Sequence, residues 1–178
     1  MHPKALAALA TVTLHAFNPV EVEQFLAGLV TGLVQEDDFT KIQTCLVDAY
    51  GLERQIQTAL GDFMKGDLQD ILKGVKEMGA ILSEVPADLG DCKAMSGDIA
   101  RIESWAQIFK DPKALVSSVV KNVLTHGPAI AGDISKTVSD IGNADMTNAG
   151  VDVADLLVLT LGKVPAAVDP ETLEVTQW

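Results

Sequence analysis

Apolar residues recur every three or four positions along most of this 178-residue chain, with polar residues between them. This spacing gathers the apolar side chains on one face of an α-helix. The strict alternation that half-buried strands need is scarce, and only 4% of the residues are aromatic. The pattern therefore predicts an all-α fold, a single-domain bundle or array of about five to seven helices.

Helix boundary signals divide the chain into segments. Asn18-Pro19 and Asp111-Pro112 each combine an N-cap residue with a proline at the first helical position. Gly66-Asp67 opens a further helix, and Pro86 is expected to stop it. We therefore predict helices over about 18–34, 38–63, 67–85, 87–109, 111–142 and 147–162.

The helix over 111–142 contains its own interruption. Pro128 lacks a backbone donor and disfavours helical geometry at Gly127, so we expect a kink or a break there. His126 precedes this point. It is interpreted as a cation near a helix C-terminus, which the helix dipole stabilises, in preference to a catalytic base.

Two apolar surfaces are candidates for helix packing or interaction. Gly28 and Gly32 lie four residues apart, a spacing that lets another helix approach closely. Because only about ten apolar residues surround them, a crossing between soluble helices is favoured over a membrane dimer. The last helix carries the most apolar run of the second half, so we expect it to be central or covered by a partner. The candidate packing or interaction residues are Gly28, Gly32, Leu156, Leu157, Leu159 and the C-terminal Trp178.

The two ends of the chain differ from the middle. Residues 1–16 hold one lysine, an apolar stretch of ten residues and an alanine before Phe17, the pattern of a short secretory signal. Two interpretations stay open: a cleaved leader, or a retained N-terminal helix. Residues 17–164 form the predicted helical domain. Residues 165–178 contain two prolines and no helical stripe, and are expected to be an extended or disordered tail.

The only two cysteines are Cys45 and Cys92. Each belongs to an apolar stripe, so both are predicted to face the core from their own helices. There is no C-x-x-C motif, and two cysteines so far from the core-region histidine do not make a zinc site. A disulfide and a pair of buried thiols are the remaining alternatives. The apparent export signal favours a Cys45–Cys92 disulfide.

Charge narrows the range of partners. The chain has 25 acidic and 13 basic residues, a formal net charge of −12. Such an acidic surface repels nucleic-acid phosphates, so we expect no nucleic-acid partner. No segment is long and apolar enough to predict a transmembrane helix.

The usual catalytic and cofactor motifs are missing from the sequence. It contains no G-x-S-x-G elbow, no phosphate-binding loop, no G-x-G-x-x-G, no H-E-x-x-H and no calcium loop. Helical acid pairs such as Asp152 with Asp155 are interpreted as chance features of an acidic chain. We therefore predict no catalytic residue, metal or cofactor, and a protein that is not an enzyme.

Phe25-x-x-Gly28-x-x-x-Gly32, Cys45 and Cys92 give the chain a resemblance to a broad group. In a short leader, a glycine-spaced apolar opening and two cysteines about 50 residues apart, it resembles secreted, all-helical two-cysteine proteins of single-celled eukaryotes. That resemblance implies a fold and a secreted or otherwise oxidising compartment, and it supplies no activity. Residues from Pro165 onward lie outside it.

The leading function hypothesis is a non-enzymatic structural or protein-interaction module that assembles with itself or with other subunits. The alternative is a carrier of a lipid or another apolar small molecule in a cavity of the helical bundle. Leucine-, valine- and alanine-rich helices with few aromatic residues suggest such a cavity.

Overall fold

The computed structural model describes residues 17–36, 39–45, 50–89, 92 and 95–165. All regular structure within these residues is helical, and the all-α prediction is confirmed. The elements are α2 (Pro19–Val34), α3 (Phe39–Cys45), η1 (Tyr50–Leu52), α4 (Glu53–Lys65), α5 (Leu68–Asp88), α6 (Ser96–Trp105), η3 (Ala106–Lys110), α7 (Pro112–Gly142) and α8 (Met146–Leu161).

Side-chain caps start four of these helices. Asn18 forms a capping box with Glu21: its Oδ1 accepts the Glu21 amide at 2.8 Å, and the Glu21 carboxylate accepts the Asn18 amide at 3.2 Å. Asp67, Asp111 and Asp145 cap α5, α7 and α8 in the same way, each accepting a backbone amide three residues on. A carboxylate or amide at this position satisfies a backbone donor that the helix leaves unpaired.

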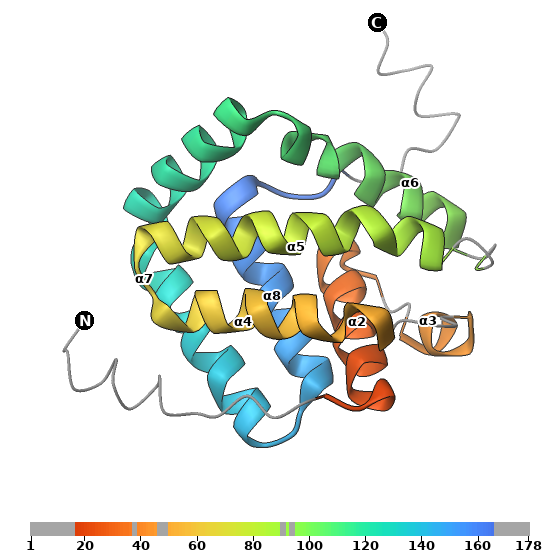
Figure 1. Ribbon diagram of the computed structural model, residues 1–178. Coiled ribbons are helices and arrows are strands. Elements are labelled where there is room, and N and C mark those ends of the chain that lie inside the picture. The colour runs from red at the N-terminus through yellow and green to blue at the C-terminus, as the bar shows by residue number, and fades with distance from the viewer. Residues whose placement is uncertain (1–16, 37–38, 46–49, 90–91, 93–94, 166–178) are drawn as a thin grey trace, which may run out of the picture.

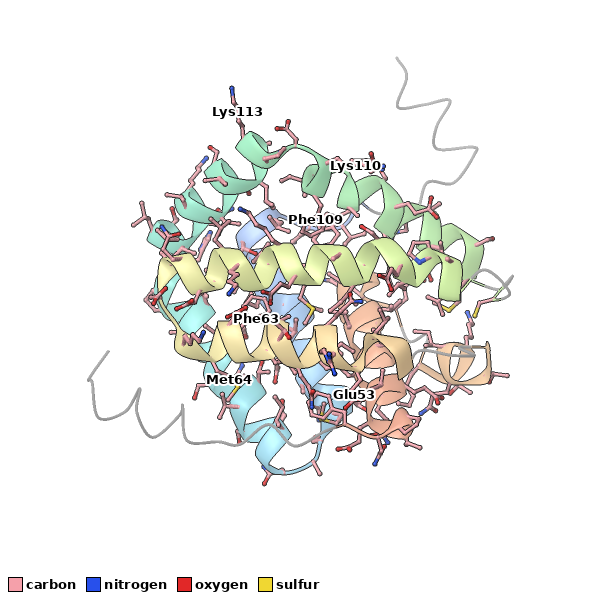
Figure 2. All side chains as sticks on the ribbon, viewed as in Figure 1. Glu53, Phe63, Met64, Phe109, Lys110 and Lys113 are labelled. Carbon is pink, nitrogen blue, oxygen red and sulfur yellow. The ribbon has the colours of Figure 1, made fainter. Side chains whose placement is uncertain are left out.

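Helix α8 is the centre of the domain. It packs against α2 on one side and α7 on the other, while α4 and α5 lie side by side across the bundle (Figure 1). Between α4 and α5 the ring of Phe63 lies against Gly74, where there is no side chain to keep the helices apart (Figure 2). The expectation that the last helix is central is therefore met.

Two predicted helices are wrong in their extent. The expected helix over 38–63 is not continuous, because residues 50–52 form a 3-10 turn before α4 begins. Gly51 lies in that turn, and glycine costs about 1 kcal/mol in a helix interior. Pro86 does not stop α5, which continues to Asp88. The Pro86 ring lies in the last turn of α5, two residues before the helix ends at Asp88.

Cys92 is not on a helix, contrary to the prediction of a helix over 87–109. The amide of Cys92 donates to the Leu89 carbonyl at 2.9 Å, and the amide of Met95 donates to the Cys92 carbonyl at 2.9 Å. These bonds join residues three apart, the spacing of tight turns. Turns of this kind bury the same apolar positions as a helix would, and all three residues are at most 4% exposed.

The interruption of α7 is confirmed. His126 has non-helical dihedrals, φ −117° and ψ 23°, two residues before Pro128. The helix resumes and ends at Gly142, followed by the C-cap residue Asn143. The kink divides α7 into an N-terminal half that ends near His126 and a C-terminal half that packs along α8.

Arg101 on helix α6 links the C-terminal end of α2 to the segment that follows α8. Its guanidinium donates to the Asp98 carboxylate at 3.1 Å, to the Val34 carbonyl at 3.2 Å and to the Pro165 carbonyl at 2.6 Å. The indole of Trp105 donates to the Gly162 carbonyl at 2.9 Å. Helix α6 therefore holds the C-terminal end of α2 and the segment that follows α8.

Candidate functional site

Gly28 and Gly32 lie against α8 within the same molecule. A Cβ at Gly28 would overlap the Thr147 carbonyl oxygen, and one at Gly32 would lie 2.7 Å from the Ala154 Cβ. Gly150 of α8 complements them, because a Cβ there would overlap the Phe25 carbonyl oxygen. The close-packing face is thus used to join α2 to α8, which leaves it covered.

Gly150 and Ala154 were missed by the reasoning from sequence. They repeat on α8 the four-residue spacing of small residues that Gly28 and Gly32 have on α2, and that spacing was the available signal. The other candidate residues of this helix, Leu156 and Leu157, are at most 1% exposed, and Leu159 is partly buried. Trp178 lies outside the described residues.

The exposed apolar surface lies on the N-terminal half of α7 instead. Leu124 is 78% exposed, although the apolar spacing of this helix predicts that it faces the core together with Leu115 and Val119. Val116, Val120 and Val123 beside it are partly exposed. Leu115 and Val119 turn the opposite side of the helix into the core. We call the four residues Val116, Val120, Val123 and Leu124 the α7 flank. Leu124 is the exposed member of this group, and the three valines beside it are partly buried, Val123 against the core.

The charge around the α7 flank differs from that of the rest of the chain. Residues 112–132 contain no aspartate or glutamate, although the chain has 25 in all. Lys113 and Lys121 are exposed within this stretch. Lys113 points away from the bundle at the start of α7 (Figure 2). The α7 flank is therefore an apolar strip with basic neighbours on an acidic protein.

A pair of carboxyl groups joins α4 to α5. Asp62 is 4% exposed, and Lys65 and Lys73 hold their Nζ atoms 3.4 and 4.0 Å from its Oδ1. Its Oδ2 and the Oε2 of Glu77 are buried and have no donor in the described part of the chain. Burial, together with a hydrogen bond to Asp62 and the charge of that group, raises the pKa of Glu77 to about 7. A proton shared between the two carboxyl groups satisfies both oxygens.

Two similar pairs join α7 to α8. Asp133, which is 4% exposed, hydrogen-bonds to Asp155, and Asp152 hydrogen-bonds to Asp140. Burial is the main cause that raises the pKa of Asp133 and of Asp152 to about 7, and the neighbouring acids add to it while Lys136 opposes it. Asp152 and Asp155 of α8 thus pair with acids of α7 across the contact between the two helices. The interpretation of these acids as chance features did not predict this pairing. The signal in the sequence was the position of Asp133. It lies three residues after the buried Ile130, so the two side chains share one face of α7.

The three carboxyl pairs predict that the protein is more stable in mild acid than in mild base. Their raised pKa values mean that the folded chain binds more protons than the unfolded chain between about pH 4 and about pH 7. The stabilisation is complete below the unfolded values and is lost as the pH rises through about 7. Allowing for solvent screening of the partly exposed groups, we expect a loss on the order of 2 kcal/mol between pH ~5.5 and pH ~8, or roughly 4–8 °C in Tm.

Thermal unfolding followed by circular dichroism at the two pH values measures this effect. The double variant Glu77→Gln with Asp152→Asn should reduce the dependence to the part that Asp133 contributes, because an amide provides the shared hydrogen without titrating. Glu103→Gln, an exposed position on α6, is the matched control and should keep the wild-type slope. A Tm that rises with pH in the wild type would contradict the assignment of shared protons.

Several hollows open onto the described surface. One of about 590 Å³ lies between α4 and α5, is open to solvent and is lined by Arg54, Gln55, Thr58 and Glu77 among others. The more enclosed apolar one, beside the α7 kink, has a volume of about 130 Å³. A pocket for a lipid-sized ligand has about 300 Å³ or more and is mostly apolar. Neither hollow combines the volume and the lining that an acyl chain needs.

The described residues hold no group of three or more histidine, cysteine, aspartate or glutamate side chains arranged to bind a metal ion. His126, the described histidine, is exposed at the α7 kink. No helix in the described segments has the length and hydropathy to cross a membrane. The chemistry that the described residues do offer is packing, ion pairing and proton sharing between helices.

Comparison with protein families gives one result that covers most of the chain. Residues 7–161 match the family described as SctB-like, secreted protein B-like. The chain belongs to this family. Comparisons of the SctB-like chain with curated proteins and with solved structures give no match. The family description names a secreted protein and assigns no reaction, ligand or partner.

Proposed function

We propose that this SctB-like chain is exported and acts as a non-enzymatic module that binds another protein through the α7 flank. The observation that carries the proposal is the 78% exposure of Leu124 in a strip with Val116, Val120 and Val123. Apolar surface exposed in the folded state lowers the free energy of the system when a partner covers it. The family description, secreted protein B-like, supports the export.

The α7 flank is a better candidate for the binding surface than the surfaces expected from the sequence, because most of those are covered within the domain. Gly28 and Gly32 are already in contact with α8, and Leu156 and Leu157 are buried inside the domain. Gly28, Leu156 and Leu157 are therefore not available to a partner of the folded chain, whereas Gly32 is partly exposed beside α8. The large exposed apolar residues of the described surface are Leu124 and Val20, on α7 and at the start of α2.

The alternative function, a carrier of an apolar small molecule, has weaker support. Its ligand would need an apolar cavity, and the enclosed apolar hollow beside the α7 kink is only about 130 Å³. The larger hollows open to solvent and have charged groups in their walls. Absence of a co-purified ligand in native mass spectrometry, and of binding to a fluorescent fatty acid, is the expected result.

We further propose that Cys45 and Cys92 form a disulfide, as export would allow. Cys92 is 4% exposed, and Cys45 is the only other cysteine in the chain. The backbone of Cys45 ends α3, and its side chain lies outside what the structure describes. In the chain-entropy picture a bond closing this 48-residue loop stabilises the fold by about 4 kcal/mol.

Mass spectrometry of the unreduced protein tests this pairing. We expect the intact chain to be two hydrogens lighter than its reduced form, and a protease digest to contain the Cys45 and Cys92 peptides joined together. Alkylation of both thiols in the native, unreduced protein would contradict the disulfide. Reduction should lower the stability of the fold without removing its helical circular dichroism at low temperature.

Site-specific photo-crosslinking in the extracellular medium of the source cells tests the binding surface. A photo-reactive residue replaces Ser117, which is exposed seven residues, or two helical turns, before Leu124. We expect one defined adduct that an excess of unmodified protein removes by competition. The same residue at Val20, the other exposed apolar position, is the control and should give no such adduct. Equal labelling from both positions, or none from either, would contradict the proposed function.

A further inference from the structure

We propose that the partner of the α7 flank is a second copy of this chain, which receives Leu124 in the open hollow between its α2 and α8. The inference rests on the proposed function, because it takes the α7 flank as a binding surface and names what covers it. Three observations support it: the shape of the hollow, the charge around it and the direction in which the two surfaces face.

The hollow between α2 and α8 suits an apolar side chain. It has a volume of about 450 Å³, and Gly32, Val151 and Val158 contribute to its lining. Gly32 brings α2 close to Val151 and Ala154 of α8. The polar part of the lining comes from Thr31, Gln35, Glu36 and Asp155. Leu124 is the most exposed large apolar side chain of the described residues. The volume admits this leucine with the neighbouring Val120.

The charges on the two surfaces are opposite. Glu36 and Asp155 line the hollow, and both side chains are exposed to solvent. Within the molecule Glu36 lies 3.6 Å from the Arg101 guanidinium and Asp155 hydrogen-bonds to Asp133, so Lys121 adds a second partner to each acid. On the α7 flank Lys121 lies three residues before Leu124, so both project from neighbouring positions of the helix. Docking Leu124 into the hollow brings Lys121 to the acidic rim. Opposite charges of this kind guide association and select the correct partner.

A second copy explains this complementarity better than a membrane does. An anionic lipid surface attracts Lys110, Lys113 and Lys121, but it repels the acidic residues that dominate the rest of the chain. The hollow of another copy presents acidic groups and apolar side chains in one place. Leu124 cannot reach the hollow of its own molecule, because its exposed side chain points away from the core that α8 occupies.

The contact joins two different surfaces, so it is heterologous and repeats. Each copy uses its α7 flank for one neighbour and its hollow for another, which generates a ring or an open chain of copies. Assembly should therefore pass beyond a dimer as concentration rises. It should weaken at high salt, because the ion pairs at the rim are exposed.

Light scattering and sedimentation velocity of the purified full chain test the inference. We expect the average mass to increase from low micromolar to submillimolar concentration, and Leu124→Asp and Asp155→Lys each to weaken association at least tenfold. Both positions are exposed, and circular dichroism checks that the variants are folded. Val20→Asp, the same type of change at the other exposed apolar residue, should leave assembly unchanged.

A mixture of the two variants gives the sharpest outcome. The Asp155→Lys copy keeps its flank and the Leu124→Asp copy keeps its hollow, so the mixture should form a one-to-one complex and nothing larger. A closed dimer unaffected by Asp155→Lys would overturn the hollow as the binding site. A protein that stays monomeric at every concentration would overturn the inference, as would one that remains monomeric in solution but binds vesicles containing phosphatidylserine.

The failure of this inference can be distinguished from the failure of the proposed function. If the purified chain is monomeric while photo-crosslinking from Ser117 captures a different protein, only the second-copy inference is wrong. If the chain is monomeric and the crosslinker gives no competed adduct, the α7 flank is not a binding surface and both are wrong.

Discussion

Gly150→Ala should destabilise the protein by about 3 kcal/mol, the upper end of the usual cost of overpacking a core. The added methyl group would overlap the Phe25 carbonyl oxygen and lie 2.7 Å from the Leu29 amide nitrogen. Both obstacles are backbone atoms of α2, so no change of rotamer makes room and α2 must move away from α8. For a chain of this length we expect Tm to fall by roughly 6–12 °C.

Gly132→Ala is the matched control for this prediction. Gly132 also lies inside a long helix, but a Cβ there would have no heavy atom within 4 Å beyond its own helix and neighbours. Alanine is the better helix former by about 1 kcal/mol, so the control variant should be as stable as the wild type or slightly more. Equal Tm values for the two variants would show that α2 and α8 are not in backbone contact at Gly150.

Arg101→Met should destabilise the fold by about 3–5 kcal/mol, the typical cost of removing one partner from a buried charge pair. The Arg101 side chain is 12% exposed and the Asp98 side chain 11%. Without the guanidinium, the Asp98 carboxylate loses its 3.1 Å partner, and the carbonyls of Val34 and Pro165 lose their donors. Chemical denaturation, followed by tryptophan fluorescence of Trp105, measures the loss.

Arg101→Lys separates the effect of charge from that of geometry, and Arg54→Met is the control. Arg101→Lys keeps the positive charge but cannot donate to three acceptors in one plane, so we expect it to recover only part of the loss. Arg54→Met removes an exposed arginine from α4 and should change stability by at most about 0.5 kcal/mol. If Arg101→Met were as mild as Arg54→Met, then α6 would not hold the ends of α2 and α8 together.

Local signals in the sequence predicted helix boundaries well. Asn18, Asp67 and Asp111 start helices because a side chain three residues before an unpaired amide can accept its hydrogen whatever the rest of the fold does. The kink before Pro128 is equally local, since the missing donor and the ring both act on adjacent residues. Such features need no knowledge of distant segments.

Regular apolar spacing does not by itself prove a continuous helix. Leu89, Cys92 and Met95 are buried as expected, but turns with three-residue hydrogen bonds bury them. An apolar residue at every third position fits both a helix and a series of turns. Similarly, the stripe through residues 39–63 contained the turn at Gly51, and nothing in the spacing of apolar residues marked it.

The carboxyl pairs are a second kind of feature that the sequence alone does not predict. Asp62 and Glu77 are 15 positions apart, and Asp133 and Asp155 are 22 positions apart. Each pair forms because two helices meet at a particular register, which brings together groups that are unremarkable along the chain. Their shared protons follow from burial at those contacts, so the dependence of stability on pH could not be read from the number of acidic residues.

The sequence by itself determined the all-α class, the starts of α2, α5 and α7, the kink in α7 and the central position of the apolar α8, because these depend on periodicity and on neighbouring residues. Only the tertiary structure decided how the surfaces are used. Gly28 packs against Thr147 and Gly150 of α8, and Gly32 against Val151 and Ala154, whereas Leu124 is exposed because no described helix packs on that side of α7. Whether an apolar face is core or binding surface depends on what lies opposite it, and that is set by helix packing.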